Sequence, residues 1–497
     1  MCDHRREAGA TRHAGRLLTR VRGRSAAWRW LIAIRATAAL AACASNHPLG
    51  PVPPDRATAF LDTLEQRTFH YFWDLTNPQN GLTPDRWPTQ SFSSIAAVGF
   101  ALTAYPIGVE RGYVTRTQAA ERTLTTLRFF WTEPQGPDAS GMTGYHGFFY
   151  HFLDQNTGQR FGQVELSTID TALLLAGVLF AQSYFDGPAP VERAIRDTAE
   201  SLYARAEWRW AQPRPPAVSH GWTPEGGFLP YDWRGYNEAM ILYVLALGSP
   251  TFPVDPSAWG EWVSTYQWGS FYGQEHVAFG PLFGHQYSHV WVDFRGIQDA
   301  YMRGRGIDYF ENSRRATYAQ RAYAVANPAT WRGYGDRIWG LTASDGPANV
   351  ALQLDGRTRD FHTYWARGAA LGEIGDDGTV APTAAGGSVA FVPEIAIPAL
   401  IAMRETYGPH LFSTYGFLDA FNPTFTAAVP VERGTVDPAL GWFDSDYLGI
   451  DQGPMLAMVE NYRTGLVWRY MRHNPAIVRG LTRAGFTGGW LAQAPTR

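Results

Sequence analysis

The chain has 497 residues, of which 45% are hydrophobic, 14% aromatic and only 18% charged. This composition can fill a large core, and it excludes an intrinsically disordered chain. The formal net charge of −3 falls to −10 without the first 42 residues, which carry nine arginines and two acids, and such an acidic chain is a poor candidate for nucleic-acid binding.

The chain opens with a predicted export signal over residues 1–42. An arginine-rich start is followed by the apolar stretch WRWLIAIRATAALAAC, which is too short for a membrane-spanning helix. Its L-A-A-C ending resembles a bacterial lipobox, so we expect Cys43 to be the lipidated first residue of the mature chain. The alternative is an ordinary signal peptide with an incidental cysteine. Because the only other cysteine is Cys2, inside the leader, the mature chain is expected to have no disulfide.

Residues 55–495 are predicted to form a single domain, because no linker-like or low-complexity stretch interrupts them. Two kinds of helix alternate along this region. One kind is apolar on nearly all sides, as is typical of a helix enclosed by others; it is predicted over 91–108, 167–185, 236–248, 287–302, 386–403 and 447–462. The other kind has one charged face toward solvent, and it is predicted over 56–74, 116–131, 191–208 and 312–326.

Six enclosed helices that alternate with solvent-facing ones predict an all-α fold, an (α/α)6 toroid with a few short strands in its loops. The alternative is an irregular all-α bundle, since the six segments share no sequence similarity. In a toroid the inner helices run parallel, and their first residues would therefore lie around one end of the barrel. These residues are Ser93, Ser94, Thr168, Asp170, Tyr236, Glu238, His285, His289, Ser388, Glu394, Asp446 and Asp451.

Ionisable side chains occur at five of these six helix starts, and the loops that lead into them are rich in aromatic residues. This combination is typical of a carbohydrate site, because sugars stack on flat apolar rings and hydrogen-bond to polar groups. The candidate substrate-binding residues are Asp170, Glu165, Tyr236, Trp233, His285, His289, Trp291, Trp339, Asp345, Glu394 and Trp442.

Glu238 precedes the uncharged run A-M-I-L-Y-V-L-A-L, and it has two interpretations. It is either a helix N-terminal acid that the helix dipole stabilises, or a carboxylic acid at the mouth of a pocket. Glycoside hydrolysis needs two carboxyl groups, one on each side of the scissile bond. Asp451 and Asp446 are the main candidates for the partner, whereas Asp444 is expected to be a loop acid. Each of these acids has the alternative role of capping a helix or binding a hydroxyl.

No metal or cofactor site is predicted. Four histidines were considered as metal ligands: His146, His151, His285 and His289. The last two have i, i+4 spacing but lack the glutamate of the H-E-x-x-H motif. No nucleophile-elbow, phosphate-binding or dinucleotide-binding motif lies in a convincing context.

Six blocks of the sequence resemble the bacterial glucoamylase-like domain proteins, a group that includes glycoside hydrolase family 144, the endo-β-1,2-glucanases. The blocks are YNEAMILYVLALGSP, FGHQYSHVWVDFRGIQDAY, YFENSRRATYAQRAYA, WGLTASDGP, APTAAGGSVAFVPEIAIPAL and DYLGIDQGPMLAMVENYRTGLVWRY. The resemblance implies an (α/α)6 barrel that cleaves β-1,2-glucan with inversion of the anomer. It also implies Glu238 as the acid and either Asp451 or Asp446 as the base.

We therefore expect an exported glycoside hydrolase, periplasmic or anchored to the outer membrane, that binds β-1,2-glucan or its oligosaccharides. A monomer is expected, with a lipid at Cys43 as its only attachment to the membrane and with no nucleic-acid partner. One alternative is a non-catalytic glycan-binding lipoprotein of the same fold, and another is an exo-acting relative that releases sophorose. A third is a polysaccharide lyase, which acts on uronic acids and would favour arginines at a mouth that is predicted to be mostly acidic or neutral.

Overall fold

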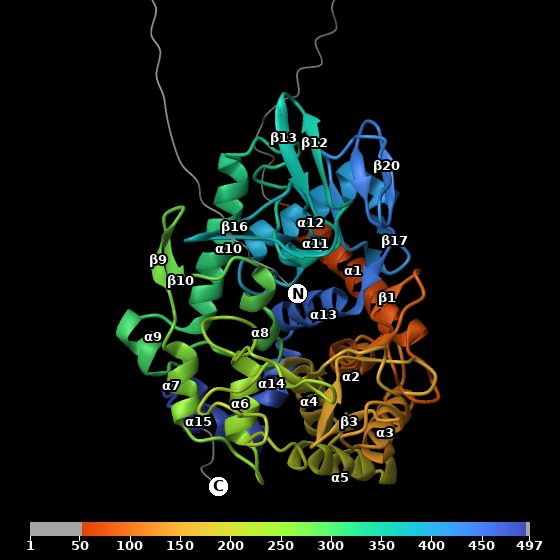
Figure 1. The fold of residues 1–497 in the computed structure, drawn as a ribbon, viewed down its shortest axis with the longest axis vertical. Coiled ribbons are helices and arrows are strands. Elements are labelled where there is room, and N and C mark those ends of the chain that lie inside the picture. Colours follow the sequence, from red (N-terminus) through yellow and green to blue (C-terminus); the bar gives the residue numbers. More distant parts are fainter. Residues whose placement is uncertain (1–51, 494–497) are drawn as a thin grey trace, which may run out of the picture. The chain divides into compact units, whose positions relative to one another are not determined.

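A computed structural model describes residues 52–493 (Figure 1). The predicted signal peptide and Cys43 lie outside the described residues. The described part is mostly helical, and many short antiparallel strand pairs join its loops. Within residues 52–493, no helix combines the length and the hydropathy that crossing a membrane requires.

Four of the six predicted apolar helices form close to their predicted bounds. Nearly every residue of the first three is buried, as expected of a helix that others enclose. The third begins at Met240, so Glu238 lies two residues before it rather than in its first turn. The four are α2 (Ile95–Glu110), α4 (Thr168–Tyr184), α6 (Met240–Gly248) and α13 (Gly449–Arg463).

The predicted helix over residues 287–302 is broken into two shorter helices. A loop separates α8 (Tyr287–Trp291) from α9 (Ala300–Arg305), and in this loop Gly296 has a φ of +74°. That left-handed conformation cannot continue a right-handed helix. Asp299 then starts α9, because its side chain accepts a hydrogen bond from a backbone N–H of the first turn.

The predicted helix over residues 386–403 is also broken in two. It is replaced by α11 (Pro382–Gly386), a turn, and α12 (Pro393–Tyr407). Pro393 lies at the first position of α12, where its missing N–H leaves no helical hydrogen bond unmade. A proline at this point therefore marks the start of a new helix, and the apolar pattern across it did not reveal the break.

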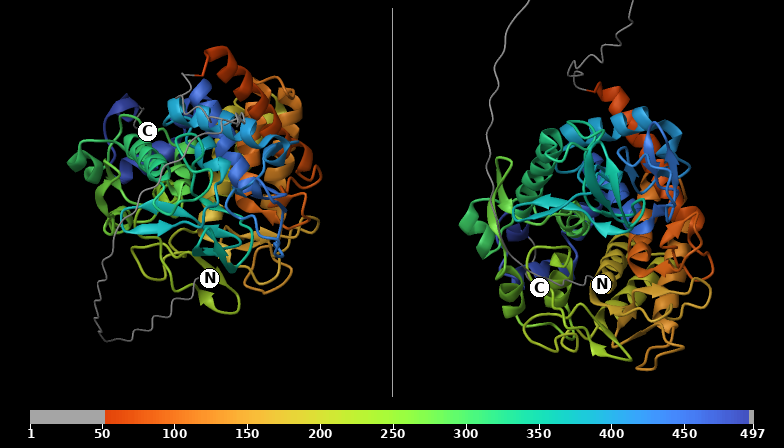
Figure 2. Two further views of the ribbon diagram at one scale, coloured as in Figure 1. Left: turned by 90° about the horizontal axis from the view of Figure 1, so that it is seen from above. Right: turned by 45° about the horizontal axis from the view of Figure 1, so that its top comes forward.

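The amphipathic helices are all present where the sequence predicts them. They lie outside the apolar helices: α1 packs on α2 and α13, α3 on α2, and α5 on α4. Both views of Figure 2 show α1, in red, beside blue segments from the C-terminal part of the chain. Their bounds are α1 (Pro54–Leu75), α3 (Arg116–Thr132), α5 (Pro190–Ala204) and α10 (Tyr309–Ala326).

The apolar helices contact one another in a closed order. Helix α2 contacts α4, α4 contacts α6, α6 contacts α8, α8 contacts α13, and α13 contacts α2. Figure 1 shows α2, α4 and α6 side by side below α13. The core of the described region therefore forms where these five helices meet.

Short strands lead directly into three of the apolar helices. Strand β2 (Ser93–Ser94) precedes α2 and pairs with β5 (Phe152–Leu153). Strand β22 (Tyr447–Leu448) precedes α13 and pairs with β1 (Arg86–Trp87). Strand β6 (Leu166–Ser167) precedes α4 and is central in a five-stranded antiparallel sheet. The other strands of that sheet are β3 (Gly144–Tyr145), β4 (Phe148–Tyr150), β7 (Gly221–Thr223) and β8 (Gly227–Phe228).

Strands are more numerous than predicted, because the loops satisfy their backbone N–H and C=O groups by pairing with one another. The remaining pairs are β9 (Trp268–Phe271) with β10 (Gln274–Val277), β11 (Ala343–Ser344) with β14 (Trp365–Ala366), β12 (Val350–Leu354) with β13 (Arg357–Phe361), β15 (Gly368–Ala370) with β16 (Glu373–Gly375), and β17 (Phe412–Ser413) with β18 (Gly416–Phe417). A three-stranded sheet has the order β19 (Phe421–Asn422), β21 (Gly441–Phe443), β20 (Thr435–Asp437). The remaining α-helices are α7 (Ser257–Val263), α14 (Leu466–Met471) and α15 (Pro475–Arg483).

Candidate active site

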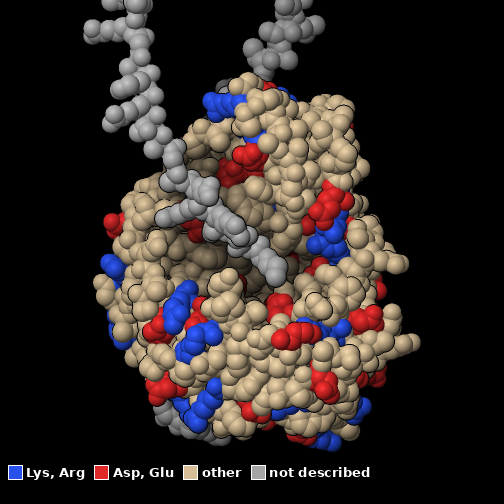
Figure 3. Space-filling view, in the orientation of Figure 1, with Lys and Arg blue, Asp and Glu red and all other residues tan. Residues whose placement is uncertain are grey.

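A cavity of about 300 Å³ lies where several of the apolar helices begin. Its wall includes the first turn of α4, the turn before α6 and the start of α13. Figure 3 shows one face of the molecule, hollowed near its centre, with acidic side chains close to the hollow. Residues that line the cavity include His151, Glu165, Asp170, His220, Trp233, Glu238, Phe283, Tyr287, Tyr364 and Ile450.

Glu238 lines this cavity and does not cap a helix. It lies in the turn before α6, whose first turn contains no acid and whose N-cap, Ala239, makes no side-chain capping bond. Its backbone carbonyl accepts a hydrogen bond of 3.0 Å from the Ser288 hydroxyl, which holds the turn against α8. Burial, and then the charge of Asp170, raise the pKa of Glu238 to about 7. A carboxyl group with this pKa can hold a proton near neutral pH, as a general acid must.

His151 lies in the same cavity between two carboxylates. Its Nδ1 is 2.9 Å from Glu165 Oε1, and its Nε2 is 3.5 Å from Asp170 Oδ2. Burial alone would lower the pKa of His151, but Asp170 and Glu165 outweigh it and raise that pKa to about 9. The imidazole is therefore a cation at neutral pH. Both carboxylates lie in the cavity as predicted, whereas this role of His151 was not.

An aromatic pair and an exposed tyrosine form the apolar part of the wall. Trp233 stacks on His220, with ring centroids 3.8 Å apart and an angle of 15° between the planes. The Trp233 indole N–H donates to the Thr168 hydroxyl at 3.0 Å, which fixes the ring at the start of α4. Tyr364 also lines the cavity and is 52% exposed. These rings offer the flat surfaces that sugars need.

Six predicted substrate-binding residues lie in the core instead, and the prediction is corrected for them. At most 4% of each is exposed, so none presents a face to a ligand. Two of them bond to core partners: His289 Nε2 is 3.1 Å from the Ser313 hydroxyl, and the Trp291 indole N–H donates to Thr103 at 3.0 Å. Large rings beside apolar runs pack into the core, which their spacing in the sequence does not distinguish from a pocket wall. The six are Tyr236, His285, His289, Trp291, Trp339 and Trp442.

The prediction is also corrected for Glu394, which lies at the surface rather than in the core. Its side chain is 50% exposed, and it accepts a hydrogen bond from the Tyr318 hydroxyl. It lies in the first turn of α12, and it is not among the residues that line the cavity. Because the predicted helix is broken before Pro393, this acid does not reach the start of an enclosed helix.

The other predicted acids lie in a second cluster, around the start of α13. Asp446 is fully buried, and Thr89 donates to its Oδ1 through the backbone N–H at 3.2 Å and the hydroxyl at 2.9 Å. Arg86 and Arg433 each approach Asp446 Oδ2 to 3.5 Å. Arg86 also donates to Asp345 Oδ2 at 2.6 Å. The ion pairs of Arg86 therefore hold strand β1 against the segment before α13.

Asp451, in the first turn of α13, faces Asp419 in this second cluster. Its Oδ2 is buried and accepts no hydrogen bond. Burial, and then the charge of Asp419, raise the pKa of Asp451 well above its usual range. Burial and Asp345 likewise raise the pKa of Asp419 to about 7. Asp419 is not predicted from the sequence, because the loop that carries it has no periodic pattern.

Tyr287 connects the two groups of acids. It lines the cavity at the start of α8, and burial, followed by the charges of Asp451 and Glu238, raises its pKa well above the usual value. Ile450, the neighbour of Asp451, also lines the cavity. The structure thus brings Glu238, Asp170, Glu165 and Trp233 together at one cavity, with Asp451 behind its wall.

Comparison with known proteins places the chain among putative glucoamylases and β-1,2-glucan hydrolases. The model of the Glycoamylase family, described as "Putative glucoamylase", matches residues 230–475. The chain has a TM-score of 0.73 and 32% identity to the crystal structure of a putative glucoamylase from Bacteroides uniformis, covering 88% of this chain and 99% of that one. It has a TM-score of 0.74 and 28% identity to the endo-β-1,2-glucanase of Chitinophaga pinensis in complex with sophorotriose and glucose, covering 87% of this chain and 99% of that one.

A curated relative has a different mode of action in its name. The chain is 28% identical over 457 residues to the exo-β-1,2-glucooligosaccharide sophorohydrolase (non-reducing end) of Parabacteroides distasonis. This alignment covers 85% of the chain but only 57% of the length of that relative. Similarity therefore extends to proteins named for exo action and to proteins named for endo action.

Proposed function

The chain belongs to the Glycoamylase family, and on this premise we propose that it hydrolyses β-1,2-glucan or oligosaccharides of it. The observation that carries the proposal is Glu238, a partly buried carboxylic acid with a pKa of about 7 in a cavity lined by stacking rings. The names of the relatives supply the linkage.

In the proposed mechanism Glu238 is the general acid. It donates its proton toward the leaving glycosidic oxygen, directly or through a substrate hydroxyl. The proposed general base is Asp451 or Asp446, near the start of α13. Both are buried behind the cavity wall, so the base would act on a water that reaches it from the cavity, on the opposite side of the sugar, which inverts the anomer. Asp170, Glu165 and His151 would hydrogen-bond to sugar hydroxyls, and Trp233 and Tyr364 would stack on sugar rings.

The activity is tested with a panel of β-1,2-, β-1,3-, β-1,4- and α-1,4-glucans, from which products are resolved by chromatography. We expect products from β-1,2-glucan, with sophorose as the sole early product of exo action and a ladder of oligosaccharides as the result of endo action. Glu238→Gln should abolish hydrolysis, whereas Glu275→Gln, at an exposed position of β10, should leave the rate unchanged. No product from β-1,2-glucan would refute the linkage, and full activity of Glu238→Gln would exclude that residue as the acid.

The same panel separates the main rival, a non-catalytic glycan-binding protein of the same fold. That rival predicts binding of β-1,2-glucan by calorimetry without any product, in wild type and Glu238→Gln alike. The two candidate bases are compared by Asp451→Asn and Asp446→Asn. Added azide should rescue the variant that lacks the base, since a small anion can replace a missing carboxylate at the attacking face.

We also propose that the helices form an (α/α)6 toroid, as a single domain over residues 55–495 and as a monomer. The closed order of contacts among α2, α4, α6, α8 and α13 supports this fold. The sixth inner position belongs to α11, which contacts α13 and is joined to the segment before α8 by hydrogen bonds of 2.8 Å from Gln286 to Ala384 and Ser388. Helices α1, α3 and α5 are the matching outer layer.

We further propose that residues 1–42 direct export and that Cys43 carries the lipid anchor, which places the enzyme in the periplasm or on the outer membrane. The basis is the arginine-rich leader and the L-A-A-C ending. Cys43→Ser in the full chain should move the exported protein from the membrane fraction to the soluble periplasmic fraction. An unchanged membrane fraction would show that Cys43 is not the anchor.

A further inference from the structure

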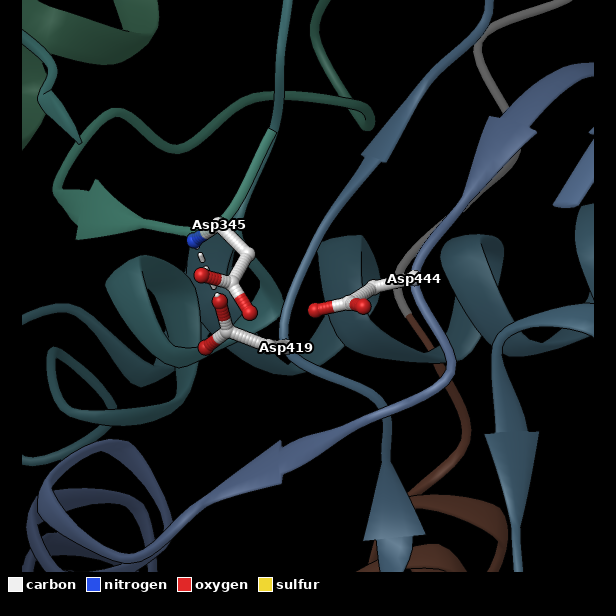
Figure 4. Close-up of side chains that lie close together, drawn as sticks. All are labelled: Asp345, Asp419 and Asp444. Atoms are coloured by element: carbon white, nitrogen blue, oxygen red, sulfur yellow. Dashed lines mark hydrogen bonds between the residues drawn. The ribbon is translucent and has the colours of Figure 1, made fainter. Parts of the chain in front are cut away.

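Three aspartates of the second acidic cluster converge on one small space. Figure 4 shows the carboxyl groups of Asp345 and Asp419 side by side, with that of Asp444 pointing toward the pair. Asp345 follows β11, Asp419 lies between β18 and β19, and Asp444 follows β21. One oxygen of each lies within 4.8 Å of the others. Three separate segments of the chain therefore contribute one carboxylate each to a common centre.

Each of these carboxylates has an oxygen that no donor reaches. The three residues are only 2–3% exposed, and Asp345 Oδ1, Asp419 Oδ1 and Asp444 Oδ2 are buried without a hydrogen-bond partner among the described residues. Buried polar atoms almost always have a partner, and a buried unpaired charge is strongly destabilising. Three unpartnered oxygens that converge on one centre indicate a missing positively charged partner.

The arginines nearby do not supply that partner. Arg86 and Arg433 form ion pairs with Asp345, at 2.6 and 3.8 Å, and with Asp446, at 3.5 Å each. Within residues 52–493, neither Asp419 nor Asp444 forms an ion pair of this kind. The positive charge is thus on one side of the cluster, and the centre between the three aspartates remains uncompensated.

We propose that Asp345, Asp419 and Asp444 bind a divalent cation, and that Ca²⁺ is the ion this site fits. Calcium–oxygen distances are about 2.3–2.6 Å, so two oxygens on opposite sides of the ion are roughly 4.6–5.2 Å apart. The three oxygens lie within 4.8 Å of one another, which this span accommodates. Magnesium keeps several waters and is usually bound through one or two carboxylates, so a buried site of three carboxylates suits it less well. Hard, all-oxygen ligands also exclude the soft metals that cysteine and histidine select.

The cation would join three segments of the chain to the start of α13. Asp345 already connects to strand β1 through Arg86, and its backbone N–H donates to Asp419 Oδ2 at 2.7 Å. An ion at the centre would hold Asp444 to this pair and keep the turn that carries Asp446 in place. Its role would be to position these loops, and it is independent of whether β-1,2-glucan is the substrate.

The experiment uses the mature chain, dialysed against EDTA and then titrated with CaCl2 by isothermal calorimetry. We expect binding of one equivalent and a rise in Tm of about 3 °C or more at saturating Ca²⁺. Asp444→Asn should weaken Ca²⁺ binding at least tenfold and abolish the rise in Tm. The matched control is Asp376→Asn, since Asp376 accepts from Tyr323, Tyr334 and Trp331 away from the site; it should lower Tm but keep the Ca²⁺-dependent rise.

Two results would overturn the proposal. If EDTA and CaCl2 leave the Tm of the wild type unchanged and no heat of binding is seen, the aspartates share protons instead of a metal. In that case Asp444→Asn should raise Tm, because it removes a mutual repulsion. If MgCl2 binds as tightly as CaCl2, the assignment of calcium is wrong. Should Asp444→Asn fail to fold, displacement of bound Tb³⁺ by Ca²⁺ in the wild type tests the same site.

Discussion

The chemistry of the site depends on how single side chains are buried. Glu238 is partly exposed to the cavity, and it lies beside Asp170 rather than beside a cation. Desolvation and this like charge both favour its protonated form. Had Glu238 been in the first turn of α6, the helix dipole and free N–H groups would have favoured the carboxylate instead. Because Glu238 lies two residues before α6 rather than within it, its surroundings favour the protonated acid over the carboxylate.

Activity and stability should both depend on the protonated form of Glu238. Because its pKa is about 7 in the fold and 4.5 as the ordinary value, the rate should fall as pH rises through about 7. Ionisation also destabilises the fold increasingly between pH 4.5 and 7. Glu238→Gln should therefore lower kcat at least about 10²-fold, yet raise Tm by about 1–3 °C at pH 8 and not at pH 4. Calorimetry at both pH values, with Glu275→Gln as control, checks this; an equal Tm at pH 8 would contradict the raised pKa.

The contribution of His151 to stability should also fall as pH rises, but over a higher pH range than that of Glu238. Its pKa is about 9 in the fold against an ordinary value of 6.5, so its ion pairs stabilise the fold fully below pH 6.5 and lose this effect as pH rises through 9. We expect His151→Gln to lower Tm by about 1–3 °C at pH 6 and to match the wild type near pH 10. It should also raise KM more than it lowers kcat, because Glu165 and Asp170 lose the group that orients them. A constant difference in Tm from pH 6 to 10 would show that packing, not charge, accounts for the loss.

Sequence alone could locate part of this site. Glu238, Asp170 and Glu165 were found because acids at the start of apolar helices stand out against their surroundings. The place of His151 between two carboxylates and that of Asp419 beside Asp345 were not predicted, because they arise from strand pairing and loop contacts between distant segments. The misassigned rings, such as Trp291 and Trp339, have the same composition around them as true pocket residues. Their burial follows only from the three-dimensional packing.

At the scale of elements, the apolar helices approach one another through glycines. Gly99 of α2 and Gly177 of α4 face each other, and a Cβ at Gly177 would lie 2.1 Å from the carbonyl oxygen of Gly99. A Cβ at Gly99 would lie 2.4 Å from the carbonyl oxygen of Leu173. Backbone atoms cannot move aside as a flexible side chain can. The contact between α2 and α4 therefore requires both glycines.

Gly177→Ala should separate α2 from α4 and destabilise the fold by about 2–3 kcal/mol, the usual cost of overpacking a core. The matched control is Gly260→Ala in α7, where a Cβ meets nothing within 4 Å. There the gain in helix propensity should stabilise the protein by up to about 1 kcal/mol. Urea unfolding of both variants measures the two effects. A Gly177→Ala variant as stable as the wild type would show that the helices are not in direct backbone contact.

The helices themselves were predictable to different degrees. Periodicity predicted α1, α3, α4 and α13 to within a few residues. It missed the breaks after α8, where the backbone turns extended at Val292, and before α12, which starts at Pro393, within otherwise apolar segments. Only a few short strands were predicted, fewer than the structure contains, since pairs of two or three residues have no pattern that a sequence window can detect.

At the scale of the whole molecule, the two ends of the described chain are joined through a buried cluster of acids and arginines. Helix α1 contacts α13, and the fully buried Glu65 of α1 accepts a hydrogen bond from Arg463 and lies 3.2 Å from Arg111 Nε. Arg111 also donates to Glu460 of α13 at 2.6 Å. These contacts link α2, the first apolar helix, to α13, the last, and so complete the closed order of helix contacts. Weakening them should therefore lower the stability of the whole described region.

Burial, and then Glu460, raise the pKa of Glu65 to about 9 from an ordinary value of 4.5. A raised acid pKa means that stability is lost as pH rises between these values, with the greatest loss at the alkaline end. Glu65→Gln cannot ionise, so the fall of Tm between pH 7 and 9.5 should be shallower than in the wild type.

Unfolding should remain a single transition at every pH, since the contacts between α1 and α13 belong to one continuous core. Calorimetry over this range checks both expectations, with Glu405→Gln, an exposed partner of Arg56, as control. Parallel pH profiles of wild type and Glu65→Gln would show that Glu65 stays paired and ionised, and a second transition would show that α1 unfolds separately from the core.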